Sequence, residues 1–473
     1  MICKNLVFYF FNNIKNATAW LSENEGFRVF YQFLVCLSVS LVIFNGLSKF
    51  TIIDYPLPFS LGRIADRILM ACCFLQIAVL LYQQRYKVVL MAISVLVCGY
   101  LPYRYHGSGE LYQLSILAIA FSGIKPKQAL NVFLVSSGFI IALSTICFLG
   151  CFYENDVLFV AWNIGVRYSL GFNYPNVAGC VLLFFILSLW CRFRSLIGDL
   201  SIFVLLLGLI YLFHFIIKSR TSEYTAIIAS IVVLYGYLRE LLKEKLYFVK
   251  FIDRYLTANL VVVSFIVLLI LFLSLSYYND PSVEVFNKLD EILSTRLKLT
   301  HLAFSQFGFS VIGTEIPDLD IDTMGLRSVT ARSYMYLDSL YAYLPIRLGV
   351  MPLIVYVLIH IIVVRNTYFT QNNRISSAMF LFAIHGFCEH MYLFAYINIL
   401  PALYLSLMVN SEKKSEYHST LETVSLPNVG SSEFITGKEE AINLLCSKTD
   451  NPNKKKVKKK THKQKLKKKS SYK

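Results

Sequence analysis

The sequence is poor in charged residues, since Asp, Glu, Lys and Arg together make up only 16% of its 473 positions. Hydrophobic residues account for 56% and aromatic residues for 15%. A soluble globular domain has about a quarter of its residues charged, because its surface faces water. The composition therefore excludes a soluble globular protein and indicates a chain surrounded largely by lipid.

The sequence also lacks the short motifs on which several enzyme classes depend. It contains no phosphate-binding P-loop, no GxGxxG fingerprint and no HExxH zinc motif. Its eleven cysteines lie mostly within apolar stretches, where cysteine acts as a small hydrophobic residue. We therefore expect no cofactor, no metal site and no disulfide framework, and we exclude nucleotide-driven transport and zinc proteolysis.

Twelve apolar stretches are candidates to cross a bilayer, whose core of about 30 Å needs about 20 apolar residues per helix. They lie at residues 29–47, 64–82, 88–101, 110–123, 129–150, 176–190, 200–217, 224–238, 258–278, 336–364, 377–392 and 393–409. Pro345 and Pro352 are expected to kink or break the tenth stretch, which is longer than one span requires. The predicted fold class is an all-α integral membrane protein with about 12 transmembrane helices.

Basic residues in the short loops predict the orientation of the chain. With a cytoplasmic N-terminus, five inner loops hold thirteen Lys and Arg residues, whereas the short outer loops hold six. Cytoplasmic loops carry the excess of basic residues in membrane proteins. We therefore expect both termini in the cytoplasm, a cytoplasmic or interfacial segment at 1–28, a transmembrane domain at 29–410 and a large extracytoplasmic loop at about 279–335.

The C-terminal segment 411–473 differs in composition from the rest of the chain. Between Asn451 and Lys473, twelve of twenty-three residues are lysine and none is acidic. Without these twelve lysines the formal net charge falls from +16 to +4, so the basicity says little about the membrane domain. We predict a disordered cytoplasmic tail that contacts anionic lipid headgroups. Nucleic acid is not an expected partner, because the lysines are not interleaved with aromatic residues.

Arginine residues on the predicted outer side run against the usual charge bias. Arg167 opens the segment RYSLGFNYPNVAG at the mouth of the sixth stretch, and Arg220 lies in the short turn IIKSRTSEY. Arg296 lies in the stretch 285–308, which we predict to be one helix across the outer mouth of the helix bundle. Each arginine alone is equally explained by a carboxylate partner or a lipid headgroup. As a set they suit a lipid-linked diphosphate, because guanidinium groups bind phosphate oxygens in a bidentate way.

Five features of the sequence resemble the Wzy-type polysaccharide polymerases of bacterial capsule, exopolysaccharide and O-antigen pathways, which are related to the O-antigen ligases. They are SLGFNYPNVAG at 169–179, SRT at 219–221, LSTRLKLTHLAFSQFGFSVIGTEI at 293–316, DSLYAYLPIRLG at 338–349, and the late residues Glu389 and Asn398. The resemblance implies an enzyme of the bacterial cytoplasmic membrane that joins undecaprenyl-diphosphate-linked oligosaccharides at the outer face, with undecaprenyl diphosphate as the leaving group. It also implies flippase and chain-length regulator proteins as partners.

The resemblance further assigns roles to individual residues. Arg296 is the expected main contact to the diphosphate, and Asp338 is either the base for the acceptor hydroxyl or a partner of an arginine. Glu389 is a second candidate carboxylate. His301 is a weaker candidate base, because five residues place it about 140° around a helix from Arg296.

The remaining expected site residues would bind the diphosphate or a sugar. Asn176 either orients the substrate or only caps the sixth span, and the turn containing Arg220 is either a phosphate contact or an ordinary capped turn. The binding set is Arg167, Gly171, Asn173, Pro175, Asn176, Lys218 and Arg220, in which Gly171 and Pro175 shape the turn.

Three other functions fit the same composition. An O-antigen-ligase-like transferase would share the helix bundle and the arginines. A flippase or transporter of lipid-linked oligosaccharides would need cationic residues along an internal cavity, whereas here they concentrate at the outer ends of helices. A scaffold without catalytic activity would tolerate replacement of Arg296.

Overall fold

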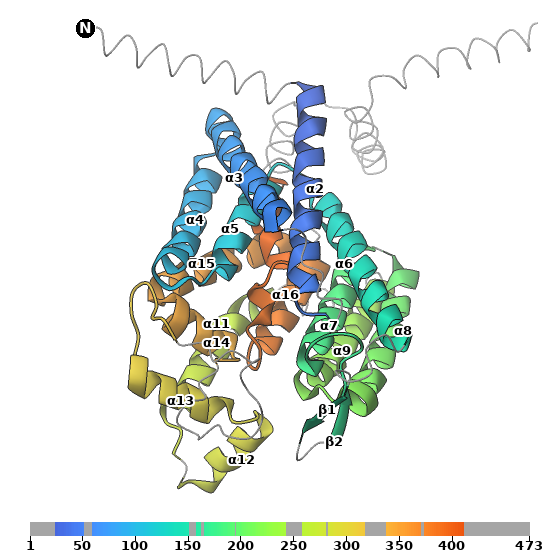
Figure 1. Ribbon diagram of the computed structural model, residues 1–473, viewed down its shortest axis with the longest axis vertical. Coiled ribbons are helices and arrows are strands. Elements are labelled where there is room, and N and C mark those ends of the chain that lie inside the picture. The colour runs from blue at the N-terminus through green and yellow to red at the C-terminus, as the bar shows by residue number, and fades with distance from the viewer. Residues whose placement is uncertain are drawn as a thin grey trace, which may run out of the picture. The chain divides into compact units, whose positions relative to one another are not determined.

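The computed structural model describes residues 24–51, 59–150, 158–161, 165–193, 195–242, 258–280, 282–316, 337–369 and 373–410. Every element described below belongs to one compact unit, Met1–Lys413, and is drawn in Figure 1. Residues 1–23 of the predicted N-terminal segment, residues 317–336 of the predicted extracytoplasmic loop and the predicted tail from residue 411 lie outside the described residues.

The first half of the unit consists of long apolar helices and one short hairpin. Its elements are α2 (Glu25–Ser48), α3 (Phe59–Tyr82), α4 (Tyr86–His106), α5 (Glu110–Phe121), α6 (Pro126–Leu149), β1 (Leu158–Ala161), β2 (Gly165–Tyr168), α7 (Pro175–Arg192), α8 (Leu196–Leu212), the π-helix η1 (Phe213–Ile217) and α9 (Arg220–Leu242). Strands β1 and β2 are antiparallel, with Phe159 opposite Arg167. Proline opens α6 and α7 at the first helical turn, where a missing N–H group costs no hydrogen bond.

The second half has shorter and more interrupted helices. Its elements are α11 (Ala258–Tyr277), α12 (Glu284–Ile292), α13 (Arg296–Phe307), α14 (Leu340–Ala342), the π-helix η4 (Tyr343–Leu348), α15 (Val350–Phe369), α16 (Asn373–His385), and the 3₁₀-helices η5 (Met391–Leu393) and η6 (Leu400–Leu403). Figure 1 shows α12, α13 and the β1–β2 hairpin at the same end of this unit. The segments that carry Arg167 and Arg296 therefore share one end of the helix bundle.

Seven helices of the described part are long and apolar enough to cross a membrane, namely α2, α3, α4, α6, α7, α8 with η1, and α9. Five shorter apolar helices accompany them, and each of the twelve predicted stretches overlaps a helix. The chain is thus a multi-pass membrane protein, and the part that the structure describes is predominantly helical with one small hairpin. A total of twelve spans, and their orientation, stay predictions.

Helix α7 lies at the centre of this arrangement. Within the most apolar 18 residues of each candidate span, α7 is 67% buried, whereas the other six are between 22% and 33% buried. The outer helices instead expose large apolar side chains, such as Val135 and Phe139 of α6, as expected for surfaces that contact lipid. Helix α7 packs against α6, α8, α9 and α16, so its first turn lies where several helices meet.

The predicted single helix over 285–308 is wrong, because the chain breaks it into α12 and α13. Ser294 and Thr295 have φ of 55° and 66°, a left-handed conformation that ends a helix. The break makes Arg296 the first residue of α13 and leaves the Leu293 carbonyl to accept a hydrogen bond from Arg296 Nη1 at 3.2 Å. The later turns at Gly308 and Gly313, with φ of 62° and 90°, lead the chain away from α13.

Three late apolar stretches are also interrupted. The stretch 336–364 breaks just after Pro345, because the π-helix η4 ends at Leu348 and Gly349 separates it from α15. The stretch 377–392 is helical only to His385, and the stretch 393–409 contains turns and 3₁₀ structure before its final helical turns. Residues 386–399 therefore form a largely buried connection that is not a membrane-spanning helix, contrary to the predicted boundaries.

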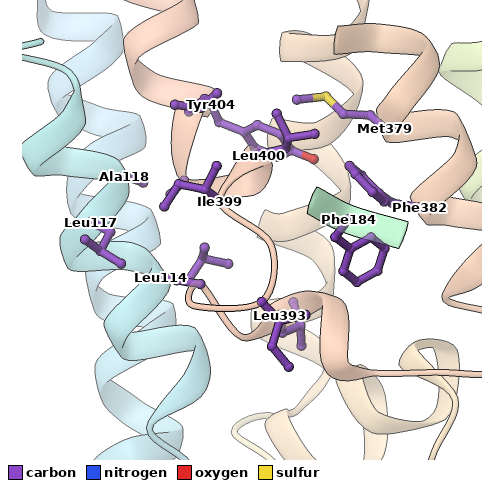
Figure 2. Packing of buried hydrophobic residues seen from close by; sticks show 14 of the residues in the cluster. Leu114, Leu117, Ala118, Phe184, Met379, Phe382, Leu393, Ile399, Leu400 and Tyr404 are labelled. Atoms are coloured by element: carbon purple, nitrogen blue, oxygen red, sulfur yellow. The ribbon is translucent and has the colours of Figure 1, made fainter. Parts of the chain in front are cut away.

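Tight apolar packing holds this connection in place. Figure 2 shows Leu114 of α5 beside Leu393 and Ile399, and all three side chains are buried. On the other side, the rings of Phe184 (α7) and Phe382 (α16) meet edge to face with centroids 5.0 Å apart. Buried aromatic pairs of this geometry add about 0.5–1.5 kcal/mol beyond area burial. The residues that follow α16 are consequently fixed between α5 and α7.

Candidate functional site

Arg296 lies at the centre of a buried charged cluster. Its Nη2 atom is 3.0 Å from Glu389 Oε1 and 3.2 Å from Asp338 Oδ2. Its Nε atom donates a hydrogen bond to the Cys388 carbonyl at 2.6 Å. With the Leu293 carbonyl as a further acceptor and only 6% of the side chain exposed, the guanidinium group is enclosed by partners within the protein.

The two carboxylates differ in exposure. The Asp338 side chain is 23% exposed, whereas that of Glu389 is 2% exposed. Asp338 therefore faces the outside of the cluster, and Glu389 lies behind it. This difference makes Asp338 the carboxylate that a substrate can reach without opening the protein.

A glycine contact brings the two carboxylate segments together. The Gly386 carbonyl accepts hydrogen bonds from the Leu340 N–H at 2.9 Å and the Ser339 hydroxyl at 3.3 Å. A Cβ atom at position 386 would lie 2.9 Å from the Leu340 side chain and 3.2 Å from the Phe382 carbonyl. A larger residue at position 386 would force the Leu340 side chain to shift, so glycine favours the close packing of the start of α14 on the turn after α16.

Burial shifts the pKa values of the charged groups in the cluster, which belong to segments outside the candidate membrane-spanning helices. Burial raises the pKa of Asp338 to about 6, with Arg296 opposing the shift. Burial and the neighbouring Asp338 raise the pKa of Glu389 to about 8, again against Arg296. For Arg296, burial disfavours the charge, but the two carboxylates outweigh it and raise its pKa. Burial thus favours the protonated form of both carboxyl groups, whereas the charge of Arg296 favours their ionised form.

Arg167 joins the cluster through Asn176. Arg167 is buried at the end of the hairpin, and its Nη2 atom donates to Asn176 Oδ1 at 2.7 Å. The amide of Asn176 in turn donates from Nδ2 to Glu389 Oε1 at 3.4 Å. Tyr174, whose side chain hydrogen-bonds Arg167, is the residue that precedes α7. Asn176 therefore does not cap α7, because its side chain links Arg167 to Glu389.

The turn before α7 has the shape that its glycine and proline require. Gly171 has φ of 86°, and a Cβ atom there would lie 2.4 Å from the Ser144 carbonyl. Pro175 is the buried first residue of α7. Asn173 is exposed, donates from Nδ2 to the Lys49 carbonyl at 2.8 Å and stands apart from the charged cluster.

The second basic segment lies at the start of α9. Lys218 ends η1 in a left-handed conformation with φ of 53°, and Arg220 is the exposed first residue of α9. Burial lowers the pKa of Arg167, and the positive charge of the nearby Arg220 also lowers it. Gly179 of α7 makes room for the hydroxyl groups of Ser219 and Ser222, which a Cβ atom would meet at 2.8 and 2.6 Å. The start of α9 is thus held against α7 beside the cluster.

His301 is not part of the cluster. It is exposed on α13, and its Nδ1 atom lies 3.1 and 3.2 Å from the carbonyls of Ser276 and Tyr277 at the end of α11. His301 and Arg296 therefore contact different partners, as their spacing of five residues on a helix predicts. His301 joins α13 to α11, and this arrangement leaves Asp338 and Glu389 as the candidate bases.

Sequence reasoning does not select two residues that border the cluster. Tyr174 contacts Arg167, and His390 donates from Nδ1 to the Asp338 carbonyl at 3.3 Å. Their signal is only proximity in sequence to Asn176 and Glu389, because a lone tyrosine or histidine is common in apolar chains. Within the described residues, no group of three His, Cys, Asp or Glu side chains is placed to hold a metal ion.

The cluster combines a partly exposed carboxylate, a second buried carboxylate and a fixed arginine, and Arg220 at the start of α9 lies near Arg167. This set suits proton abstraction beside an anionic leaving group. Comparisons with family models, with curated proteins and with solved structures find no match to this chain.

Proposed function

We propose that the protein polymerises undecaprenyl-diphosphate-linked oligosaccharide repeat units at the outer face of the bacterial cytoplasmic membrane, as the Wzy-type resemblance implies. The observation that carries the proposal is the meeting of Arg296, Asp338 and Glu389 in one buried cluster. These residues come from three separate segments, each of which belongs to the resemblance. Ionisable groups enclosed in an apolar membrane protein are costly to bury, which favours a functional role.

In this proposal Asp338 acts as the base. Its carboxylate accepts the proton of an acceptor hydroxyl while the hydroxyl oxygen forms a bond to the anomeric carbon of the donor sugar. The bond from that carbon to the diphosphate oxygen breaks, and undecaprenyl diphosphate leaves with the electron pair. Arg296 and Glu389 hold Asp338 in position, because the guanidinium group contacts both carboxylates.

Arg220 and Lys218 are the proposed contacts to the diphosphate. Arg220 is exposed at the first position of α9, where free backbone N–H groups and the helix dipole also favour an anion. Arg296 has lost most of its capacity for this role, since two carboxylates and two carbonyls occupy its donors. We therefore transfer the predicted main diphosphate contact from Arg296 to Arg220, with Arg167 behind it.

The proposal is tested with purified protein in liposomes that contain its own undecaprenyl-diphosphate repeat unit. We expect a ladder of longer glycans on a gel, without added nucleotide or metal, because the diphosphate is already a good leaving group. Transfer of one glycan to another lipid acceptor without a ladder would indicate a ligase-like enzyme. Movement of the lipid across the bilayer without longer products would indicate a transporter and overturn the proposal.

The rate of elongation is expected to rise with pH through about pH 6, because Asp338 must be deprotonated to accept a proton. Activity is then lost as the pH falls below that value. Initial rates in liposomes between pH 5 and pH 8 would show the midpoint. The same profile is recorded for His301→Ala, because His301 is another base that the sequence suggests. Loss of the midpoint in that variant would assign the titration to His301 and contradict the role of Asp338.

A further inference from the structure

A stack of aromatic rings lies next to the charged cluster. The Arg347 guanidinium lies 5.4 Å from the centroid of the Tyr343 ring, which stacks on His390 at 4.5 Å with planes 13° apart. His390 in turn meets Phe394 at 5.7 Å. Since His390 Nδ1 also donates to the Asp338 carbonyl, the stack begins beside the proposed base.

At the end of the stack away from Asp338 lies a group of three rings, which we call the ring patch. It consists of Phe50, Phe394 and Tyr396. Phe394 and Tyr396 stack with centroids 5.4 Å apart, and Phe50 stacks on Tyr396 at 5.8 Å. Tyr343 and His390 are 3% and 5% exposed, whereas all three members of the ring patch are only half-buried. The patch is therefore the part of the stack that a ligand can contact.

Backbone contacts fix the ring patch in place. Tyr396 packs directly on Gly46 of α2, where a Cβ atom would lie 2.3 Å from the tyrosine ring. The Phe50 carbonyl accepts a hydrogen bond from the Asn173 N–H at 2.8 Å, and Thr51 pairs with Phe172. The ring patch thus unites the end of α2, the turn before α7 and the connection after α16.

Two exposed polar residues lie beside one ring of the patch, Phe50, which distinguishes it from a lipid-facing apolar surface. Asn173 and Lys49 are exposed beside Phe50 and are joined by the hydrogen bond from Asn173 Nδ2 to the Lys49 carbonyl. The side-chain amide oxygen of Asn173, Oδ1, remains able to accept a hydrogen bond from a hydroxyl. Partly exposed aromatic rings next to a side-chain amide suit a ligand with an apolar face and hydroxyls at its edge.

We propose that the ring patch is a sugar-binding subsite, in which a pyranose ring of the oligosaccharide lies against Phe50, Phe394 and Tyr396 and bonds to Asn173 through a hydroxyl. This assignment rests on the proposed function and extends it from the reacting groups to the glycan. The C–H groups on one face of a pyranose contact the electron-rich face of an aromatic ring, and the contact removes apolar surface from water. The subsite positions a sugar within the same assembly that holds Asp338.

The test uses saturation-transfer NMR on full-length protein in detergent micelles, with oligosaccharides released by mild acid from the surface polysaccharide of the producing cell. We expect saturation of sugar-ring protons with wild-type protein. Phe394→Leu keeps most of the side-chain volume but removes the ring, and we expect binding about tenfold weaker, as loss of one covered ring face implies. Phe394→Tyr should retain binding. Thermal unfolding of each variant shows whether the fold is intact.

Tyr103→Leu is the matched control, because Tyr103 also stacks on a neighbour, Tyr112 at 4.8 Å, and is 45% exposed on α4. We expect this variant to bind sugar as wild type does. Equal binding by wild type and Phe394→Leu, or no saturation with wild type, would overturn the subsite. Sugar binding that depends on Phe394 in a protein that makes no ladder would keep the subsite and remove the polymerase, so the two proposals fail separately.

Discussion

Replacing Asp338 with asparagine is expected to lower the rate of glycan elongation by roughly 10²–10⁴-fold, the usual contribution of a general base. The amide keeps the size of the side chain but cannot accept the proton of the acceptor hydroxyl. Asp338 is the more exposed carboxylate of the cluster, at 23% against 2% for Glu389. Single-turnover elongation in liposomes, with substrate above saturation, measures the loss as a change in rate rather than in binding.

The control for this variant is Glu291→Gln, which removes an exposed carboxylate from α12 outside the cluster. We expect it to elongate glycans at the wild-type rate. The pH profile adds a second criterion, since the midpoint near pH 6 should vanish with Asp338→Asn. Wild-type elongation by Asp338→Asn would exclude Asp338 as the base and leave Glu389 as the remaining carboxylate of the cluster.

Replacing Arg296 with methionine is expected to lower the free energy of unfolding by about 3–5 kcal/mol, the usual cost of removing one partner from a buried ion pair. Glu389 would then be buried without its charged partner, and the Cys388 carbonyl would lose its donor. Protonation of the carboxyl groups relieves this cost. The destabilisation relative to wild type should therefore be smaller at pH 5 and larger at pH 9, above the pKa of Glu389 near 8.

Thermal unfolding in detergent across this pH range measures the effect. Arg220→Met is the matched control, because Arg220 is exposed, and we expect it to change stability by less than about 0.5 kcal/mol while weakening substrate binding. Adding Glu389→Gln to Arg296→Met should recover part of the stability, since the uncompensated charge disappears. A stability of Arg296→Met equal to wild type at pH 9 would show that the cluster does not depend on this ion pair.

Several features of the fold are predictable from the sequence for a simple physical reason. In lipid the backbone must satisfy its own hydrogen bonds, so long apolar runs such as 29–47 and 129–150 form helices, as α2 and α6 do. Pro175 and Gly171 likewise predict a helix start and a turn, because the φ angles that they favour are local properties. The position of His301 away from Arg296 follows from helical geometry alone.

Two other interruptions of helices, which contain no proline, are not predictable in this way. Residues 285–308 have the apolar spacing of a single helix, yet Ser294 and Thr295 take left-handed conformations that allow Arg296 to reach Cys388 and Glu389. The stretch 377–392 is apolar enough for a helix but ends at His385. In both places, contacts with distant residues outweigh local helical preference, which amounts to less than about 1 kcal/mol per residue.

The sequence alone determined that the protein is a helical membrane protein, because its long apolar runs must form helices in lipid. It also selected five polar residues as candidates for the site, namely Arg167, Asn176, Arg296, Asp338 and Glu389. Only the tertiary structure decided how they combine. Arg296 and Glu389 are 93 residues apart in the chain, and Asn176 and Glu389 are 213 residues apart, yet each pair is in contact. Such contacts depend on how the helices pack, because ion pairs and hydrogen bonds act over a few ångströms of space whatever the separation in sequence.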